Sequence, residues 1–311
     1  MRIVEKINQS LKNIMASDDR VFLIGEDIID PYGGAFKVTS GISTLFEARV
    51  LAMPISEGGM VGLATGMAIR GLKPIVEIMF GDFTTLTFDQ LINHASKFEW
   101  MYNSKVNVPL IIRTPMGGGR GYGPTHSQSI EKHFCGVPGL TVRCINQYSD
   151  IEHLYKEAYE SNSPQLIIEN KTMYALSCMD KTSIPDPSDP DVVILTYGSG
   201  VQVTVQAAKK LLEEEEVRVK VVPIEILSPL NHDDIRKNVS STNVVIVEEG
   251  SPGWGFASEC SLALAGQPLT LTLVSGPDHP IPNNRDWELS ALPSVDGVVK
   301  AVLQNLGLDS I

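Results

Sequence analysis

Short apolar segments rich in β-branched residues alternate with amphipathic segments along nearly the whole chain. In the first part, the apolar segments are VFLIG (21–25), PIVEIMF (74–80), VPLIIRT (108–114) and LTVRCI (140–145). Their length and composition predict buried strands, and the segments at 58–70, 87–101 and 150–161 predict helices between them. This order indicates βαβ units, and therefore an α/β fold with a mostly parallel sheet.

A change in composition divides the chain. Residues 181–191, KTSIPDPSDPD, contain three prolines and several acids without apolar periodicity, which is typical of a linker. The alternation of strands and helices resumes after it, so we predict a first domain at 1–180 and a smaller α/β domain at 192–311. The predicted strands of the second domain are 192–198, 218–226, 243–250 and 269–275, and its predicted helices are 201–214, 232–238, 255–265 and 295–306.

The overall composition limits the classes of partner. Of the 311 residues, 43% are hydrophobic and 20% are charged, so a sizeable core is expected. The formal net charge of −12 would repel a phosphate backbone, which argues against nucleic acid as a partner. No run of about 18 apolar residues occurs, so no membrane span is expected. The segment at 1–15 is typical of an amphipathic helix without the apolar middle of a signal peptide, and we therefore expect a cytoplasmic chain.

Glu57 is the first candidate functional residue. It lies in PISEGGMVGLATG, where a strand-like segment ends in a carboxylate directly before Gly58-Gly59 and an apolar helix. An acid at a helix N-terminus is commonly a cap or a partner of the helix dipole. The small residues that follow would also let a flat ligand or another backbone approach the start of the helix. The local pattern leaves both roles open for Glu57.

Three further candidates follow predicted strands. Phe83 lies just beyond PIVEIMF, where its ring could stack on a planar ligand, although a phenylalanine is by default a core residue. Glu26 follows VFLIG and is either a solvated turn residue or part of the same crevice. His126 follows the glycine-rich stretch 117–123, which lacks the context of a P-loop or a dinucleotide fold and predicts a flexible surface loop. Catalytic groups are often found beside such loops.

Several motifs occur in a characteristic order: GED at 25–27, YGGAFKVTSGI at 32–42, PISEGG at 54–59, FDQLINHASKF at 88–98, THSQS at 125–129, VEEG at 247–250 and LPSVDGVVKAV at 292–302. Together they resemble the beta subunit of thiamine-diphosphate-dependent 2-oxo acid dehydrogenases of the pyruvate, branched-chain and acetoin type. The resemblance covers nearly the whole chain. One such motif would be weak evidence, whereas the full set in order, at matching separations, is highly specific.

The resemblance implies a transketolase-like architecture, with a pyrimidine-binding domain followed by a transketolase C-terminal domain. It also implies an α₂β₂ heterotetramer that holds thiamine diphosphate between an alpha and a beta subunit. The diphosphate- and magnesium-binding motif of such enzymes, GDG followed further along by Asn-Asn, is missing here. The only Gly-Asp is Gly81-Asp82, and Asn283-Asn284 lies in the other predicted domain. We therefore expect no metal site in this chain, and expect the alpha-type partner to bind the Mg²⁺.

The resemblance also assigns roles to residues. Glu57 matches the glutamate that faces a ring nitrogen of the cofactor's aminopyrimidine and makes the cofactor's own amino group competent as a base. Phe83 matches the aromatic residue that stacks on this ring, and Glu26 matches an acid near the same end of the cofactor. His126 matches a histidine at the mouth of the active site, linked to proton transfer and to handing the acyl group to a lipoyl arm. The expected reaction is decarboxylation of a 2-oxo acid, with transfer of its acyl group to a lipoylated acyltransferase or another acceptor.

Two segments depart from the family pattern. The loop RGYGPTHSQS is bulkier than the usual glycine- or alanine-rich version, and MFGDFTTLTFDQ differs around the stacking aromatic. Both fall near the substrate funnel, so Arg120 and Tyr122 are expected to influence which 2-oxo acid is accepted. Two alternatives remain: a split transketolase or acyloin-synthase subunit that transfers an acyl or ketol unit to a carbonyl compound, and a non-catalytic scaffold subunit. Intact Glu57, Phe83 and His126 argue against the scaffold.

Overall fold

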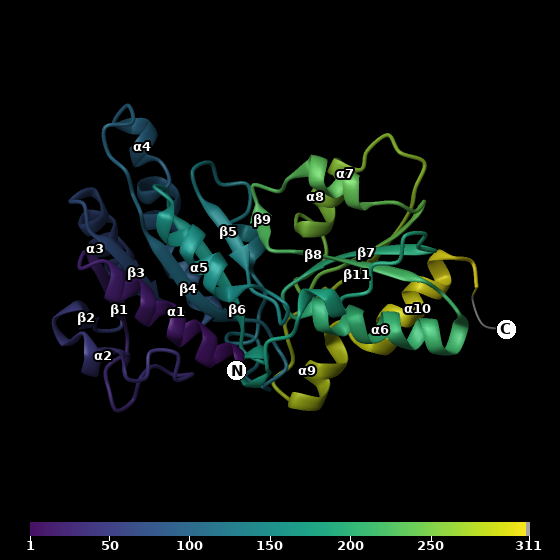
Figure 1. Cartoon of the computed structure of the whole chain (residues 1–311), viewed down its shortest axis with the longest axis horizontal. Helices are drawn as coiled ribbons and strands as arrows, with labels where there is room; N and C mark the ends of the chain where they lie inside the picture. Colours follow the sequence, from purple (N-terminus) through teal and green to yellow (C-terminus); the bar gives the residue numbers. More distant parts are fainter. Residues whose placement is uncertain (309–311) are drawn as a thin grey trace.

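The computed structural model describes residues 1–308, so the last residues of the predicted second domain, 309–311, lie outside the described part. Two sheets form the centre of this part (Figure 1). The first has the order β2-β1-β3-β4-β6-β5-β9, with β1 (Val21–Gly25), β2 (Val50–Ala52), β3 (Lys73–Glu77), β4 (Ile111–Met116), β5 (Thr141–Cys144), β6 (Gln165–Asn170) and β9 (Ile226–Ser228). The second has the order β11-β10-β7-β8, with β7 (Val192–Tyr197), β8 (Val219–Ile224), β10 (Asn243–Val247) and β11 (Thr270–Val274). Only β5 and β9 pair in antiparallel fashion among the described strands, which confirms the mostly parallel α/β fold.

Helices cover both faces of the first sheet (Figure 1). On one face lie α1 (Ile3–Ser17) and α5 (Ile151–Glu160), and on the other lies α3 (Glu57–Ile69). Successive residues of a strand point to opposite faces, so Leu23 packs in the cluster of α1 and α5 whereas Ile24 packs in the cluster of α3. A strand that is buried on both faces is continuously apolar, as VFLIG is.

The second sheet repeats this three-layer arrangement. One face is covered by α6 (Gly200–Glu215) and α10 (Val295–Asn305), and the other by α7 (His232–Asn238) and α8 (Phe256–Ala263). The apolar cluster on the α8 side continues without a break into the cluster around α3 of the first sheet. Strand β9 follows β8 of the second sheet in the chain but pairs with β5 of the first sheet. Backbone hydrogen bonds between β5 and β9 therefore also join the two halves.

Short elements complete the described chain: α2 (Ile42–Leu45), α4 (Phe98–Met101), α9 (Arg285–Ala291), and single turns at Glu47–Arg49, Glu131–His133, Met173–Ala175 and Lys181–Ser183. The last of these turns lies within the predicted linker. None of the helices within residues 1–308 has the length and apolar character that crossing a lipid bilayer requires.

The structure corrects some predicted elements. The helix predicted at 87–101 is instead a π-helical segment, η3 (Asp89–Ala95), followed by the short α4, and a 3₁₀ helix, η2 (Gly81–Thr87), precedes them. Threonine hydroxyls donate to carbonyls three residues earlier, Thr84 to Gly81 at 2.6 Å and Thr87 to Thr84 at 2.7 Å, and these local bonds favour the tighter 3₁₀ turn. The strand predicted at 218–226 is divided between β8 and β9. Strands β2 and β6 and helix α9 were not predicted.

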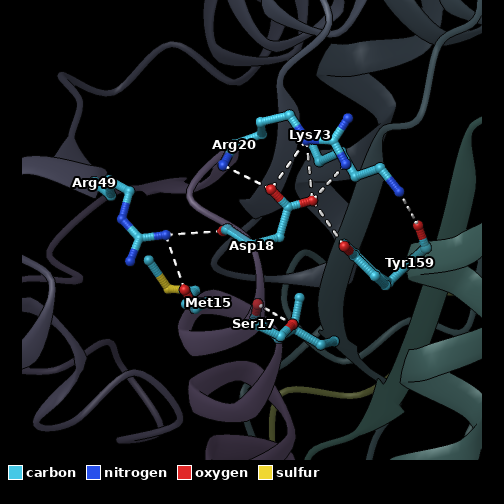
Figure 2. A network of polar contacts seen from close by, with 8 residues as sticks. Met15, Ser17, Asp18, Arg20, Arg49, Lys73 and Tyr159 are labelled. Atoms are coloured by element: carbon cyan, nitrogen blue, oxygen red, sulfur yellow. Dashed lines mark hydrogen bonds and ion pairs between the residues drawn. The ribbon is translucent and has the colours of Figure 1, made fainter.

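A network of hydrogen bonds lies at the edge of the first sheet where its strands begin (Figure 2). The Asp18 carboxylate accepts hydrogen bonds from the Arg20 guanidinium at 2.7 Å and the Tyr159 hydroxyl at 2.8 Å, which hold the pKa of Asp18 well below its usual range. Arg49 donates to the carbonyls of Met15 and Asp18, both at 2.9 Å. These contacts join the ends of α1 and α5 to the starts of β1 and β2, and they stabilise the edge opposite the candidate site.

Candidate functional site

The carboxyl ends of the first sheet's strands bring the candidate residues to one edge of the sheet. The residues that follow the strands are Glu26 after β1, Glu57 after β2, Phe83 after β3, His126 after β4 and Lys171 after β6. Because these strands are parallel, the segments that leave them emerge on the same side, which is where α/β proteins bind ligands.

Two buried carboxyl groups lie at one end of this edge. Glu57 is 5% exposed and Glu26 is 7% exposed. Burial raises the pKa of Glu26, and the neighbouring charge of Glu57 raises it further. Glu26 Oε1 is buried and has no hydrogen-bond partner among residues 1–308. An unpartnered buried oxygen is costly, so this atom favours a ligand that donates a hydrogen bond.

Glu57 occupies its position because α3 begins there. It is the first residue of the helix, where unsatisfied N–H groups and the helix dipole favour a negative charge. Gly58 follows it, and a Cβ at that position would lie 3.0 Å from the Leu86 carbonyl oxygen of η2. The glycine therefore allows the start of α3 to pack closely against the helix that carries Phe83.

Aromatic rings connect Phe83 to the glycine-rich loop. The ring of His126 lies 5.1 Å from that of Phe83 and 4.9 Å from that of Phe80, edge to face in both cases. The Tyr122 ring lies 6.0 Å from Phe80. Edge-to-face pairs at these separations are favourable. Phe83 is half-buried, so part of its ring is available to a ligand.

The structure thus brings Tyr122, Phe83 and His126 together, whereas Arg120 has other partners. Its guanidinium donates to the Lys171 carbonyl at 2.8 Å and lies 5.6 Å from the ring centre of Phe36. Thr125 Oγ1 lies 2.9 Å from His126 Nδ1. Within residues 1–308, no group of three or more His, Cys, Asp or Glu side chains is arranged to hold a metal ion.

Comparison with known proteins identifies the family. The sequence profile of the transketolase pyrimidine binding domain matches residues 1–176, and that of the transketolase C-terminal domain matches residues 181–298. The chain is 33% identical to the pyruvate dehydrogenase E1 component subunit beta of Caenorhabditis elegans, over 99% of this chain and 93% of the relative. It is also 33% identical to the acetoin:2,6-dichlorophenolindophenol oxidoreductase subunit beta of Bacillus subtilis, over 97% and 96%.

This chain belongs to the family of 2-oxo acid dehydrogenase beta subunits. The family resemblance in the sequence motifs is thereby confirmed. A solved structure titled as a split gene transketolase, inactive beta4 tetramer, has a TM-score of 0.79 and covers 98% of each chain at 20% identity. The fold of the beta subunit is therefore transketolase-like.

The residues at the sheet edge of this family member fit an aminopyrimidine ring. Such a ring has N–H donors at its rim, which suit the unpartnered oxygen of Glu26 and the carboxylate of Glu57. It is also planar and apolar on its faces, which suits the half-buried ring of Phe83. The chain thus contains acceptor and stacking groups that would suit this half of thiamine diphosphate.

Sequence reasoning missed three residues that organise the beta subunit's site: Lys171 and Glu288, which are buried, and Glu249, which is half-buried. Lys171 is fully buried and donates to the His126 carbonyl at 2.6 Å, and burial lowers its pKa to about 8. Glu249 and Glu288 bind the glycine-rich loop from the second half of the chain. Glu249 lies at the end of the strand predicted at 243–250, so the rule that found Glu26 also points to it. Lys171 follows β6, a strand that was not predicted, so that rule does not find it. No pattern in the sequence indicates Glu288.

Proposed function

We propose that this chain is the beta subunit of a thiamine-diphosphate-dependent 2-oxo acid dehydrogenase. It contributes the aminopyrimidine half of the cofactor site, and decarboxylation of a 2-oxo acid occurs there once an alpha-type partner is bound. The observation that carries the proposal is the buried pair Glu26 and Glu57, with its unpartnered oxygen, beside the Phe83 and His126 rings. The names of the relatives support the same reaction class.

Each residue has a distinct task in this proposal. When bound, thiamine diphosphate supplies the acidic carbon that attacks the 2-oxo acid and the electron sink that decarboxylation needs. Glu57 holds a proton between its carboxyl group and the aminopyrimidine nitrogen, and burial away from water strengthens that contact. Glu26, whose pKa is raised, donates or accepts at the same rim. Phe83 orients the ring by packing on its face.

His126 acts at the second step in this proposal. His126 Nδ1 is hydrogen-bonded to the Thr125 hydroxyl. The other ring nitrogen, Nε2, therefore exchanges the proton with the acyl acceptor. Its ring is held edge-on by Phe80 and Phe83, which fixes the direction of that nitrogen. Tyr122, on the same loop, is placed to contact the substrate's side chain, whereas Arg120 shapes the loop from behind.

The proposal includes the partners and the compartment. The alpha-type subunit binds the diphosphate and Mg²⁺, because the motif for them is missing from this chain, and the assembly is an α₂β₂ heterotetramer. The acyl acceptor is a lipoylated acyltransferase. Cys135, Cys144, Cys178 and Cys260 are free thiols in the described chain, which suits a reducing compartment such as the cytoplasm, although several relatives are mitochondrial.

A reconstituted complex tests the reaction. Co-expression with an alpha-type subunit from the same genome should give a complex that decarboxylates a 2-oxo acid in the presence of an artificial electron acceptor. A panel of linear and branched 2-oxo acids identifies the substrate. A complex that forms but instead transfers a ketol or acyl unit to an aldehyde would replace this reaction with the transferase alternative.

Calorimetry tests the division of the cofactor site. The chain alone should bind thiamine diphosphate weakly, because charge-assisted contacts to the diphosphate are the strong ones and belong to the partner. The reconstituted complex should bind it tightly and in a Mg²⁺-dependent way. Tight, Mg²⁺-dependent binding to the isolated chain would overturn the shared site.

A further inference from the structure

A buried carboxylate from the second half of the chain lies under the glycine-rich loop of the site. Glu288, in α9, is 0% exposed. Its Oε1 accepts hydrogen bonds from the backbone N–H of Gly119 at 2.5 Å and of Arg120 at 3.1 Å. Its Oε2 accepts from the N–H of Gly123 at 3.4 Å and from the Ser127 hydroxyl at 3.2 Å. One side chain therefore receives donors from both ends of the loop.

The loop's glycines fit the surface that carries Glu288. Gly119, Gly121 and Gly123 all have positive φ, between 77° and 94°, a conformation that glycine adopts at no steric cost. A Cβ at Gly121 would lie 2.9 Å from the Cβ of Arg285. The glycines thus bring the loop backbone close enough to α9 for its N–H groups to reach the carboxylate. The loop lies at the surface, as predicted, and its backbone is also bound from beneath by Glu288.

A second carboxylate anchors the two flanks of the loop. Glu249, after β10, accepts from the Gly118 N–H at 2.6 Å and from the Ser129 hydroxyl at 3.0 Å. It also accepts from Asn170 at 2.9 Å and from Ser199. Glu249 therefore fixes where the loop leaves and rejoins the first sheet, and Glu288 determines its path in between.

We propose that Glu288 is a positioning residue of the active site, which sets the path of loop 118–127 and so the placement of Tyr122 and His126. This inference rests on the proposed function. The physical basis is that a buried carboxylate with four donors is satisfied only when the loop follows one path. Figure 1 shows α9 at the junction of the two halves, so the second half of the chain acts on the site through this helix.

Hydrogen–deuterium exchange tests the structural part without any need for activity. In the reconstituted complex, Glu288→Ala should speed amide exchange in loop 118–127 at least roughly tenfold, because three N–H groups lose their acceptor. Glu288→Gln keeps one oxygen and the side-chain volume, so its exchange should fall between those of Glu288→Ala and wild type. Asp286→Asn, an exposed acid on the same helix, is the matched control and should not change the loop. Wild-type exchange in both Glu288 variants would overturn the proposal.

Kinetics test the consequence for the site. For the best 2-oxo acid, Glu288→Ala should lower kcat/KM roughly 10- to 100-fold, mainly through KM, and Glu288→Gln should recover part of this loss. Thiamine diphosphate affinity should change much less than kcat/KM, since the loop reaches the cofactor residues through the packing of His126 on Phe83. Faster loop exchange with wild-type kinetics would overturn the positioning role and leave the proposed function intact. If the wild-type complex had no activity, the proposed function would be wrong. The exchange experiment would still test whether Glu288 holds loop 118–127 in place.

Discussion

Glu57 is a single carboxylate whose position in the fold makes it useful. It is buried at the first turn of α3, near a second buried acid, Glu26. Burial and the neighbouring charge of Glu57 raise the pKa of Glu26.

Glu57→Gln should abolish turnover in the reconstituted complex while leaving its assembly intact. The amide keeps the size of the side chain but cannot exchange the proton, and loss of general acid–base help typically lowers rates by about 10²- to 10⁴-fold. The measurement is the rate of exchange of the cofactor's acidic proton. Glu47→Gln, an exposed acid, is the control. Proton exchange at the wild-type rate in the Glu57 variant would rule out this role.

His126→Ala should separate the two half-reactions. Decarboxylation, measured with an artificial electron acceptor, should be spared more than acyl transfer to the lipoylated acceptor, because His126 is assigned to the second step. The ratio of the two rates reports this without absolute values. His153→Ala, on the exposed surface of α5, should leave the ratio unchanged. Equal loss of both half-reactions would place His126 in the first step.

At the scale of elements, a buried ionic cluster joins the central strands of the first sheet. Arg113 of β4 pairs with Glu77 of β3 and with Glu169 of β6, the last through a 2.9 Å bond from Nε, and all are buried. Tyr174 donates to Glu169 at 2.5 Å. Charges this deep in a sheet are tolerated only because each has partners, and the cluster therefore specifies which strands become neighbours.

Arg113→Met should destabilise the fold by about 3–5 kcal/mol, because it leaves Glu77 and Glu169 buried without their cation. Denaturant unfolding of the isolated chain measures this change in free energy. Arg236→Met, which breaks an exposed pair with Asp233 on α7, is the matched control and should cost less than about 1 kcal/mol. Equal effects of the two substitutions would show that the buried cluster is not a specific source of stability.

At the scale of the whole molecule, one acid joins the two halves of the chain. Glu131, in the turn at Glu131–His133, is buried and accepts a hydrogen bond from the Tyr197 hydroxyl of β7. Burial raises the pKa of Glu131 from 4.5 to about 7. Between these values the folded chain binds a proton that the unfolded chain has released, so the contribution of Glu131 to stability falls as pH rises.

Glu131→Gln should remove this pH dependence. From pH 4.5 to 7, wild type should lose on the order of 3 kcal/mol of unfolding free energy relative to Glu131→Gln. Above pH 7 the difference between the two proteins should no longer change. Urea unfolding at several pH values measures it, with the exposed Glu213→Gln as the control. If the difference in unfolding free energy between the two proteins did not change with pH, Glu131 would have the same pKa in the folded and the unfolded chain.

The sequence by itself determined most of the order of the strands and helices, because the spacing of apolar residues encodes which faces are buried. Strands β2 and β6 and helix α9 were missed. Glu26, Glu57, Phe83 and His126 could be singled out from their places after predicted strands and from the family motifs. Their arrangement around one edge required the sheet order. The single α-helix predicted at 87–101 is instead divided into the π-helical η3 and the short α4, a difference that the apolar spacing does not reveal.

Only the tertiary structure decided which buried charges meet. Arg113 and Glu169 lie 56 residues apart in the chain, and Glu288 lies 169 residues from Gly119. Local periodicity carries no information about such pairs, since each depends on how the strands are ordered and how the two halves pack. The β6 strand was missed because its Glu169 and Asn170 look like surface residues until their partners are in place. The physical reason is the same for Arg113, Glu169 and Glu288: a charged side chain is stable in the interior only beside a partner that the fold brings to it.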